Sequence, residues 1–185
     1  MSKGAAVWIG LFRGINVGGN HKLPMKELVK VMLGAGMTNV RTYIASGNVV
    51  FRSDRPEAAL IAEIESLVEE HFGFRAQFFL ITLKHLEKLM AANPFKDHEL
   101  KGKAQHLFFL KGPASKVDYE LMDNLKADNE EYRLTDECFY FYAPDGVGQS
   151  KLMEKLGRCI KADMTARNLN TVETLREMAA ELEAG

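Results

Sequence analysis

The polar side chains best suited to ligand binding lie in short segments that contain glycine or precede a predicted helix. The first segment, residues 11–25, runs from an apolar stretch through three glycines to a proline that suits a first helical turn. Glycine tolerates backbone angles that side chains forbid, so amide N–H groups could converge there on an anion. A long glycine-rich connection without a ligand explains the segment equally well. Its candidate ligand-binding residues are Arg13, Asn16 and Lys22.

This first segment is not a P-loop. Gly14 and Gly19 have the spacing of the two glycines in G-x-x-x-x-G-K-[ST], but Asn20 stands where that motif has its phosphate-binding lysine. No G-x-G-x-x-G motif occurs in the chain either. Nucleotide binding through these two motifs is therefore excluded.

A second segment, residues 144–151, places Gly146 and Gly148 before Ser150, a predicted helix N-cap, and Lys151. A lysine in the first helical turn is slightly unfavourable for an isolated helix, so Lys151 is weak evidence for an anionic ligand. A solvated lysine beside an ordinary cap is the alternative. Ser150 and Lys151 join the candidate ligand-binding set.

A third segment, residues 165–171, precedes the last predicted helix. Asn170 and Glu173 fit a capping box for that helix. Arg167 and Asn168 then lie just ahead of a helix N-terminus, where a guanidinium and an amide could hold a carboxylate or phosphate. Alternatively, Arg167 pairs with a nearby acid and the asparagine closes a turn.

A β-hairpin is predicted around Gly47, between two strand-like runs. A two-residue hairpin turn needs a residue that tolerates a positive φ angle, so we expect one at Gly47 or Asn48. Tyr43, Ser46 and Asn48 border this turn and complete the candidate ligand-binding set.

The first half of the chain predicts the element order strand, helix, strand, strand, helix, strand. This is the order of the ferredoxin-like arrangement. Trp8, in the apolar first strand, is expected to be mostly buried, and Asp54 with Glu57 fits a capping box for the second helix. The predicted elements are strand 7–12, helix 25–33, strands 40–46 and 49–51, a helix ending near Phe72, and strand 76–81.

The second half repeats much of this pattern. A short helix capped by Thr82 leads into a connector at residues 93–103. We predict an α/β (α+β) protein made of two ferredoxin-like halves, residues 1–92 and 103–185. The elements expected after the connector are strand 105–110, a helix beginning at Ser115 and Asp118, strands 131–135 and 138–143, helix 151–156, and a final helix in place of a clear closing strand.

Composition places the chain among ordinary globular proteins. Of its 185 residues, 46% are hydrophobic and 26% are charged, and no apolar run has the length of about 18 residues that a membrane span needs. No secretory signal is visible. Two cysteines, Cys138 and Cys159, are expected to be reduced thiols of a cytoplasmic protein. The five histidines show no metal-ligand spacing with them, so neither a metal nor another cofactor is expected.

The formal net charge of −1 conceals an uneven distribution. Residues 1–55 contain eight Lys and Arg against two Asp and Glu, whereas the remainder contains sixteen against twenty-three. A basic N-terminal segment could attract phosphates, but the chain does not resemble a strongly basic nucleic-acid domain. Strong DNA binding is therefore not expected.

Four runs of this sequence, residues 11–19, 41–51, 148–152 and 165–171, resemble the family called domain of unknown function 1697. The resemblance extends over nearly the whole chain, with the runs in the same order. It implies a bacterial-type cytoplasmic α/β protein with two ferredoxin-like halves. It implies no established activity, substrate or catalytic residue.

Three functions are compatible with these residues. The first is binding of an anionic small molecule, a nucleotide or an RNA end in a cleft formed by the glycine loops. The second is an enzyme, with Lys151 or Ser46 as nucleophile and Tyr43 as acid. The chain shows no Ser-His-Asp order, metal set or carboxylate pair, so no mechanism can be written. The third is a protein-interaction module.

Binding is the favoured hypothesis because it needs only convergent donors. It predicts that Arg13, Lys151 and Arg167 line one cleft with few acids among them. At least two of the three should lie within about 10 Å of each other, roughly one Debye length at 0.1 M salt.

Overall fold

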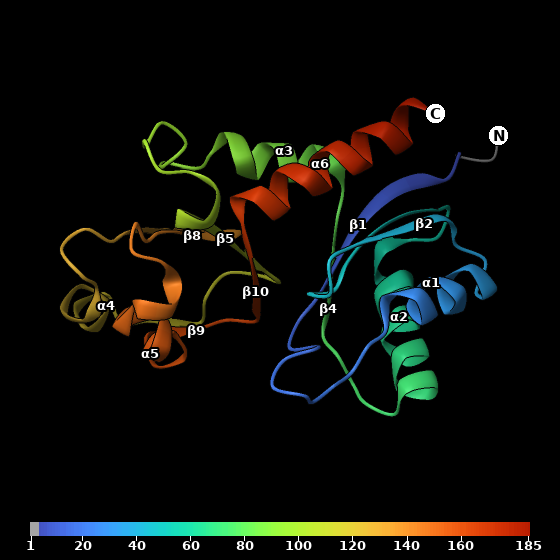
Figure 1. Ribbon diagram of the computed structural model, residues 1–185, viewed down its shortest axis with the longest axis horizontal. Coiled ribbons are helices and arrows are strands. Elements are labelled where there is room, and N and C mark those ends of the chain that lie inside the picture. The colour runs from blue at the N-terminus through green and yellow to red at the C-terminus, as the bar shows by residue number, and fades with distance from the viewer. Residues whose placement is uncertain (1–3) are drawn as a thin grey trace. The chain divides into compact units, whose positions relative to one another are not determined.

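Two structural units share the chain, and the computed structural model describes residues 4–185 of it (Figure 1). The first unit contains the described residues up to Glu87 together with residues 174–185, and the second contains residues 88–173. The protein is a mixed α/β structure in which each unit has a four-stranded antiparallel sheet.

Helices carry the chain across both unit boundaries. Helix α3 (Leu83–Ala91) begins in the first unit and ends in the second, and helix α6 (Leu169–Ala184) returns the chain to the first. The boundaries therefore differ from the predicted halves, and the connector predicted at residues 93–103 lies inside the second unit. Thr82 caps α3 as predicted, since its hydroxyl accepts a hydrogen bond from the backbone N–H of His85 at 3.2 Å.

The first unit has the predicted order β-α-β-β-α-β, that of the ferredoxin-like arrangement. Its sheet has the strand order β2-β3-β1-β4, so β3 lies between the two strands that α1 connects. The elements are β1 (Ala6–Phe12), α1 (Met25–Gly34), β2 (Thr38–Tyr43), β3 (Asn48–Ser53), α2 (Glu57–Phe72) and β4 (Phe78–Ile81).

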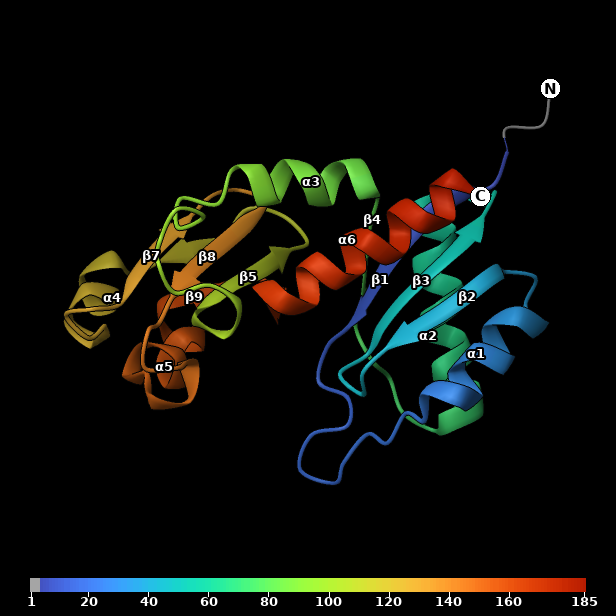
Figure 2. The ribbon, with the colours of Figure 1, turned by 45° about the horizontal axis from the view of Figure 1, so that its top comes forward.

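Helices cover both faces of the first sheet (Figure 2). On one face, Trp8 and Phe51 pack in a core with apolar residues of α1 and α2. Trp8 is only 9% exposed, which confirms the prediction that it is buried. On the other face, the last part of α6 is held by an Arg41–Glu181 ion pair of 3.0 Å between side chains of β2 and the helix.

The β2–β3 connection is longer than the sequence predicted. Tyr43 pairs with Asn48, so residues 44–47 form a four-residue loop in place of a two-residue turn. Gly47 has φ 82°, which confirms the predicted left-handed residue. Ile44 is also left-handed, with φ 48°. The two left-handed residues are the first and the last of the loop, whereas in a two-residue type I′ turn they would be adjacent.

The predicted capping box of the second helix is wrong. Helix α2 begins at Glu57, and its N-cap position is Pro56, whose side chain accepts no capping hydrogen bond. Pro56 is extended, so the chain becomes helical two residues later than a cap at Asp54 requires. The end of the helix is as predicted, because Gly73 adopts the left-handed C-cap conformation with φ 78°.

The second unit also contains the order β-α-β-β-α-β, with the sheet order β10-β5-β8-β7. Strand β10 closes this sheet, where the sequence analysis expected only a final helix. Strands β6 and β9 form a separate two-stranded sheet. The elements are β5 (Gln105–Leu110), β6 (Lys116–Val117), α4 (Tyr119–Leu125), β7 (Glu131–Leu134), β8 (Cys138–Tyr142), α5 (Lys151–Cys159), β9 (Ile160–Lys161) and β10 (Met164–Asn168), with 3₁₀ turns at Gly102–Ala104 and Val147–Gln149.

Helix α4 starts later than predicted. Asp118 is its N-cap, and its carboxylate accepts a hydrogen bond from the N–H of Leu121 at 2.9 Å. Ser115 does not cap the helix, because Lys116 and Val117 pair in β6 with β9.

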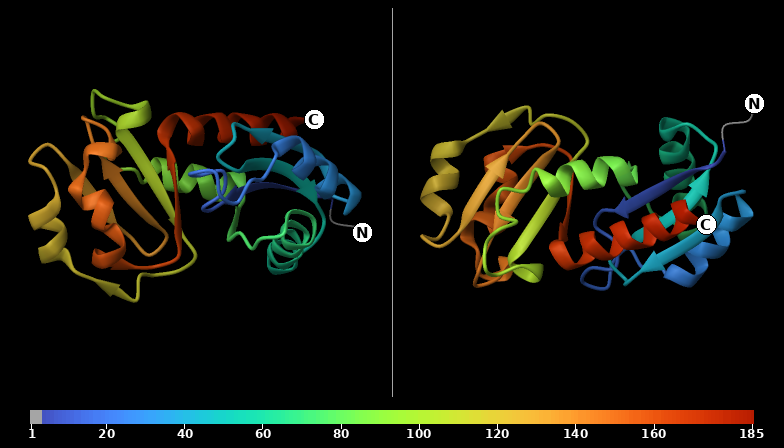
Figure 3. Two further views of the ribbon diagram at one scale, coloured as in Figure 1. Left: turned by 60° about the horizontal axis from the view of Figure 1, so that its bottom comes forward. Right: turned by 90° about the horizontal axis from the view of Figure 1, so that it is seen from above.

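The two faces of the second sheet have different coverings. Helices α4 and α5 lie side by side on one face, where Phe139, Phe141 and Met164 pack against them (Figure 3). On the other face, the Tyr140 hydroxyl donates a 2.9 Å hydrogen bond to the carbonyl of Leu89 at the end of α3. Alternation along β10 therefore places Met164 and Arg167 on opposite faces.

Candidate functional site

Three connections of the first unit meet at one end of its sheet (Figure 2). They are residues 13–24 between β1 and α1, residues 44–47 between β2 and β3, and residues 73–77 between α2 and β4. We call these three connections the loop end. They meet there because β1 leaves the sheet where β3 and β4 enter it.

Contacts between the connections fix the loop end. The backbone N–H of Arg13 donates to the carbonyl of Gln77 at 3.0 Å. The imidazole of His21 stacks on the ring of Phe74, with 4.8 Å between the ring centroids. These contacts tie the longest connection to the one that precedes β4.

Asn16 organises the longest connection through its side-chain amide. Its amide nitrogen donates to the carbonyls of Leu23 at 3.0 Å and Ala45 at 2.7 Å, and its amide oxygen accepts from the N–H of Leu23 at 2.8 Å. Its backbone is left-handed, with φ 54°, a conformation that asparagine tolerates. The Asn16 side chain, which was predicted to bind a ligand, therefore forms hydrogen bonds with the main chain and positions the loop.

Asn48 plays a similar part in the β2–β3 connection. Its buried amide nitrogen donates to the carbonyl of Tyr43 at 3.0 Å and to the hydroxyl of Ser46 at 2.9 Å. An amide donor cannot take the proton of a hydroxyl, so this contact does not activate Ser46 as a nucleophile. Gly47 is buried because its Cα faces Phe12 and Ile15, where an added Cβ would come within 2.8 Å of both side chains.

The loop end carries cations without acids. Residues 13–24, 44–47 and 73–77 contain Arg13, Lys22 and Arg75, and no Asp or Glu. Arg13 is exposed, and its guanidinium donates to the Gln77 side-chain oxygen at 2.9 Å.

Lys22 is exposed as well, and it makes no ion pair with any residue that the structure describes. Its neighbour His21 stacks on Phe74, the neighbour of Arg75, so Lys22 and Arg75 belong to connections that touch. The three connections therefore carry three cations and no acid of their own, and Arg75 is the one that faces an acid of α2.

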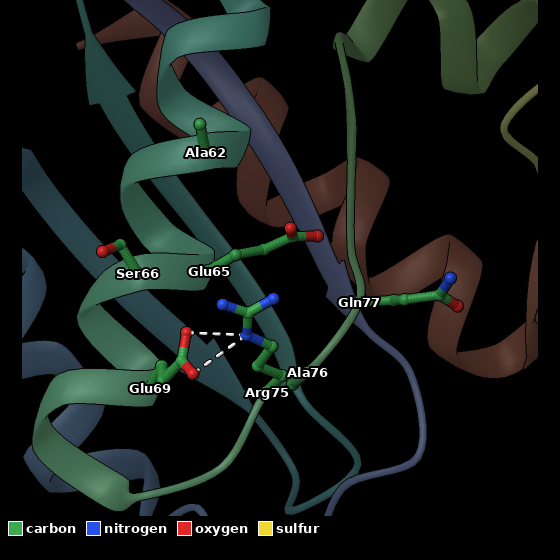
Figure 4. A pocket seen from close by; sticks show the side chains of 7 residues that line it. All are labelled: Ala62, Glu65, Ser66, Glu69, Arg75, Ala76 and Gln77. Atoms are coloured by element: carbon green, nitrogen blue, oxygen red, sulfur yellow. Dashed lines mark hydrogen bonds and ion pairs between the residues drawn. The ribbon is translucent and has the colours of Figure 1, made fainter.

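A polar pocket of about 430 Å³ adjoins the loop end, between α2 and the chain that leads into β4 (Figure 4). The Nε–H of Arg75 faces both carboxylate oxygens of Glu69, at 2.9 and 2.8 Å, and this contact raises the pKa of the guanidinium. Glu65 also lines the pocket and accepts the N–H of Phe78 at 2.8 Å. The acids Glu65 and Glu69 lie on the α2 side of this pocket. An anion is therefore favoured at Arg13 and Lys22 and disfavoured in the pocket itself.

Ser150 of the second glycine segment caps a helix. The Ser150 hydroxyl accepts from the N–H of Met153 at 3.1 Å, which confirms the predicted N-cap of α5. Lys151 follows as the first, exposed residue of that helix.

The cap of α6 lies two residues earlier than predicted. The Asn168 side-chain oxygen accepts from the N–H of Thr171 at 3.0 Å, and α6 begins at Leu169. The capping box predicted for Asn170 and Glu173 is therefore wrong. Asn170 instead lies against Gly102, where an added Cβ would come within 2.6 Å of its side-chain oxygen.

Arg167 is a buried strand residue. Its guanidinium donates to the Thr165 hydroxyl at 3.0 Å and to the carbonyl of Ala166 at 2.7 Å. Burial lowers the pKa of Arg167 to about 10, so the side chain stays protonated at neutral pH.

The structure does not bring Lys151 and Arg167 together. Arg167 pairs with Leu107 and lies on the face of Tyr140, whereas α5 covers the opposite face of the same sheet. This placement speaks against one cleft shared by these two cations. Arg13 belongs to the other unit, and its proximity to either of them stays a prediction.

Sequence reasoning missed Arg75, Gln77 and His21 as parts of the loop end. The available signal was Gly73, which ends α2 directly before the strand that pairs with β1. His21 gave no signal, because its stacking partner Phe74 lies far along the sequence.

The described residues show no obvious catalytic centre. No group of three His, Cys, Asp or Glu side chains among them could hold a metal ion. Burial raises the pKa of the Cys138 thiol to about 12, which makes it a poor nucleophile at neutral pH. Within residues 4–185, no helix combines the length and apolar character needed to cross a membrane.

Comparison with known proteins identifies the family. A family described as protein of unknown function (DUF1697) matches residues 6–140, well over half of the chain. The chain belongs to this family. The family resemblance predicted from the sequence is thereby confirmed over residues 6–140. No curated protein matches this DUF1697 chain.

A solved structure has a similar fold. It is that of a conserved bacterial protein from Streptococcus pneumoniae, which is 24% identical to this DUF1697 chain with a TM-score of 0.71. The similarity covers 95% of this chain and 99% of the other. At this level of identity the likeness concerns the fold alone.

Proposed function

We propose that this DUF1697 protein binds a phosphate-bearing or other anionic ligand at the loop end of its first unit. The observation that carries the proposal is the meeting of three connections that contain Arg13 and Lys22 and no acid of their own, while their third cation, Arg75, is paired with Glu69 of α2. Arg75 already faces the Glu69 carboxylate, so the cation best placed to pair with an anion is Lys22, which makes no ion pair with any residue that the structure describes. The site differs from the cleft predicted from sequence, since it lies within a single unit.

Helix α1 supports the same location. It begins at Met25, directly after residues 13–24, and its N-cap Pro24 supplies no side-chain hydrogen bond. Uncapped N–H groups and the positive end of the helix dipole favour an anion in front of a helix. Acid is present there only as Glu27, which pairs with Lys30 at 2.9 Å.

The proposed ligand class is a nucleotide, an RNA end or a smaller anionic metabolite of the cytoplasm. The two free cysteines are buried, as suits a protein of a reducing compartment. A net charge of −1 disfavours strong, non-specific DNA binding. A binding function also needs no activated group, and the amide donor that faces the Ser46 hydroxyl does not activate it as a nucleophile.

The test is a ligand screen on the purified full chain. Mass spectrometry of retained small molecules should be combined with thermal-shift measurements using tripolyphosphate, nucleotides and a short 5′-phosphorylated RNA. A ligand at a hundred times its dissociation constant should stabilise the fold by about 2.7 kcal/mol. No stabilisation by any of these probes at millimolar concentration would refute the proposal.

A further inference from the structure

Ile44 combines two properties that the fold does not explain. Its φ of 48° is left-handed, a rare conformation for a β-branched residue that costs on the order of 1–3 kcal/mol. Its side chain is nevertheless 53% exposed, so burial of this apolar group does little to offset that cost. Asparagine or glycine would suit the same backbone better and would expose no apolar surface.

Val17 presents a second exposed apolar side chain at the loop end. It is 68% exposed and forms an isolated bridge with Asn20 at the tip of residues 13–24. The Asn16 amide donates to the carbonyl of Ala45, so a hydrogen bond of 2.7 Å joins the chain neighbours of Val17 and Ile44. We call these two side chains the apolar tip.

The surroundings of the apolar tip indicate what covers it. The same connections carry Arg13 and also Lys22, which is exposed and makes no ion pair with any residue that the structure describes, so the partner combines an apolar surface with negative charge. Two side chains are too few for a protein interface, which buries on the order of 1,000 Å² or more. Membrane-binding surfaces favour Trp, Phe and Leu beside their cations, and the tip has only Val and Ile. A flat nucleobase attached to a phosphate matches both the size and the charge.

We propose that Val17 and Ile44 pack against the base of a nucleotide or RNA end whose phosphate lies at Arg13 and Lys22. The inference rests on the proposed function and deepens it, because it names the part of the ligand that the loop end recognises besides phosphate. It also gives a reason for the strain at Ile44: the left-handed turn presents an apolar side chain to the ligand.

The experiment compares ligands that differ only in the base. Isothermal titration calorimetry of the full chain should measure AMP, GMP, CMP and UMP against ribose 5-phosphate. The best nucleotide should bind about tenfold more tightly than ribose 5-phosphate. In Ile44→Asn that preference should fall to about twofold or less, while the melting temperature stays the same or rises because asparagine tolerates the backbone angle. A residue that only supports the fold would lower the melting temperature instead.

A matched control is available in the same unit. Leu33 is also an exposed apolar residue, at 48%, but it lies near the end of α1 away from the loop end. Leu33→Asn should leave the preference for the base unchanged. Val17→Thr, which exchanges one methyl group for a hydroxyl, should reduce that preference by about threefold.

The possible outcomes separate this inference from the proposed function. Equal binding of nucleotides and ribose 5-phosphate overturns the base contact and leaves anion binding intact, as does binding of tripolyphosphate alone. Failure of every phosphate probe overturns both. A base preference that survives Ile44→Asn overturns the role of the tip. Binding to phosphatidylserine vesicles that Ile44→Asn abolishes, without any base preference, overturns the inference in favour of a membrane.

Discussion

The two glycine-rich segments look alike in the sequence and serve different purposes in the structure. Residues 13–24 form a connection in which Arg13, Val17 and Lys22 are exposed, and the Asn16 amide holds it in shape. Residues 144–150 form a short approach to α5, where Ser150 caps the helix and Asp145 accepts a hydrogen bond from the Asn129 amide at 2.9 Å. The second segment therefore uses Ser150 and Asp145 locally and exposes one cation, Lys151, whereas the first exposes two, Arg13 and Lys22.

The comparison shows what distinguishes a structural glycine segment from a candidate binding segment. Glycine content and a following helix are common to both. The difference lies in where hydrogen bonds and charges go: Ser150 and Asp145 face main-chain or side-chain donors nearby. Lys22, by contrast, faces solvent.

The largest expected effect separates the glycines of the two units. In Gly47→Ala, the new Cβ would lie 2.6 Å from the Ile15 side chain at a backbone φ of 82°, so overpacking and strain should cost about 3 kcal/mol or more. In Gly148→Ala the new Cβ meets nothing within 4 Å, so stability should change by about 0.5 kcal/mol or less. Urea unfolding of both variants checks the contrast. A similar loss of unfolding free energy in the two variants would mean that the loop end is not packed more tightly than the second glycine segment.

Acid should weaken the second unit through His106. Burial lowers the pKa of this side chain to about 4, so the folded state favours the neutral ring and the unfolded chain takes up the proton first. The resulting stability is present above pH 6.5 and is lost as the pH falls toward 4. Between pH 7.5 and pH 4.5 the loss from this one residue should be about 2–3 kcal/mol.

His106→Gln isolates this contribution. Between pH 7.5 and pH 4.5, the free energy of unfolding should fall by about 2–3 kcal/mol less in the variant than in the wild type. Urea unfolding at both pH values measures this difference. An identical pH dependence in His106→Gln and the wild type would contradict the assignment.

A smaller contrast concerns the two polar residues that shape the segments. Asn16→Ala removes three hydrogen bonds to the main chain and should cost about 2 kcal/mol. Ser150→Ala removes one helix cap and should cost about 1 kcal/mol. Hydrogen exchange should show loosening of residues 13–24 in the first variant only. Unchanged exchange there in Asn16→Ala would mean that the amide does not organise the loop.

The sequence predicts elements best where apolar side chains recur with a clear period. The apolar run at β1 and the helical spacing of α1 gave both elements to within one residue or so. Strand β10 was missed because Thr165 and Arg167 look like loop residues, although on one face of the strand they hydrogen-bond each other at 3.0 Å. Polar pairs of this kind depend on a sheet partner that periodicity does not reveal.

The candidate site was only partly predictable, for a similar reason. The glycines and cations of residues 13–24 are visible in sequence, and Ser150 was correctly assigned as a cap. The structural task of Asn16 was not visible, because one of its acceptors, Ala45, lies on a different connection. Arg167 was grouped with Lys151 because residues 164–168 were not predicted as a strand, so the alternation that places Arg167 on the face opposite α5 was not applied.

The most direct test of the account compares cations of the two segments. Tripolyphosphate affinity should be measured by calorimetry at two salt concentrations for the wild type, the double variant Arg13→Gln with Lys22→Gln, and Lys151→Gln. The account predicts at least a tenfold loss of affinity and a weaker salt dependence in the double variant, with Lys151→Gln unchanged, since both removed charges are at the loop end. Loss of affinity in Lys151→Gln, with the double variant binding like the wild type, would contradict it.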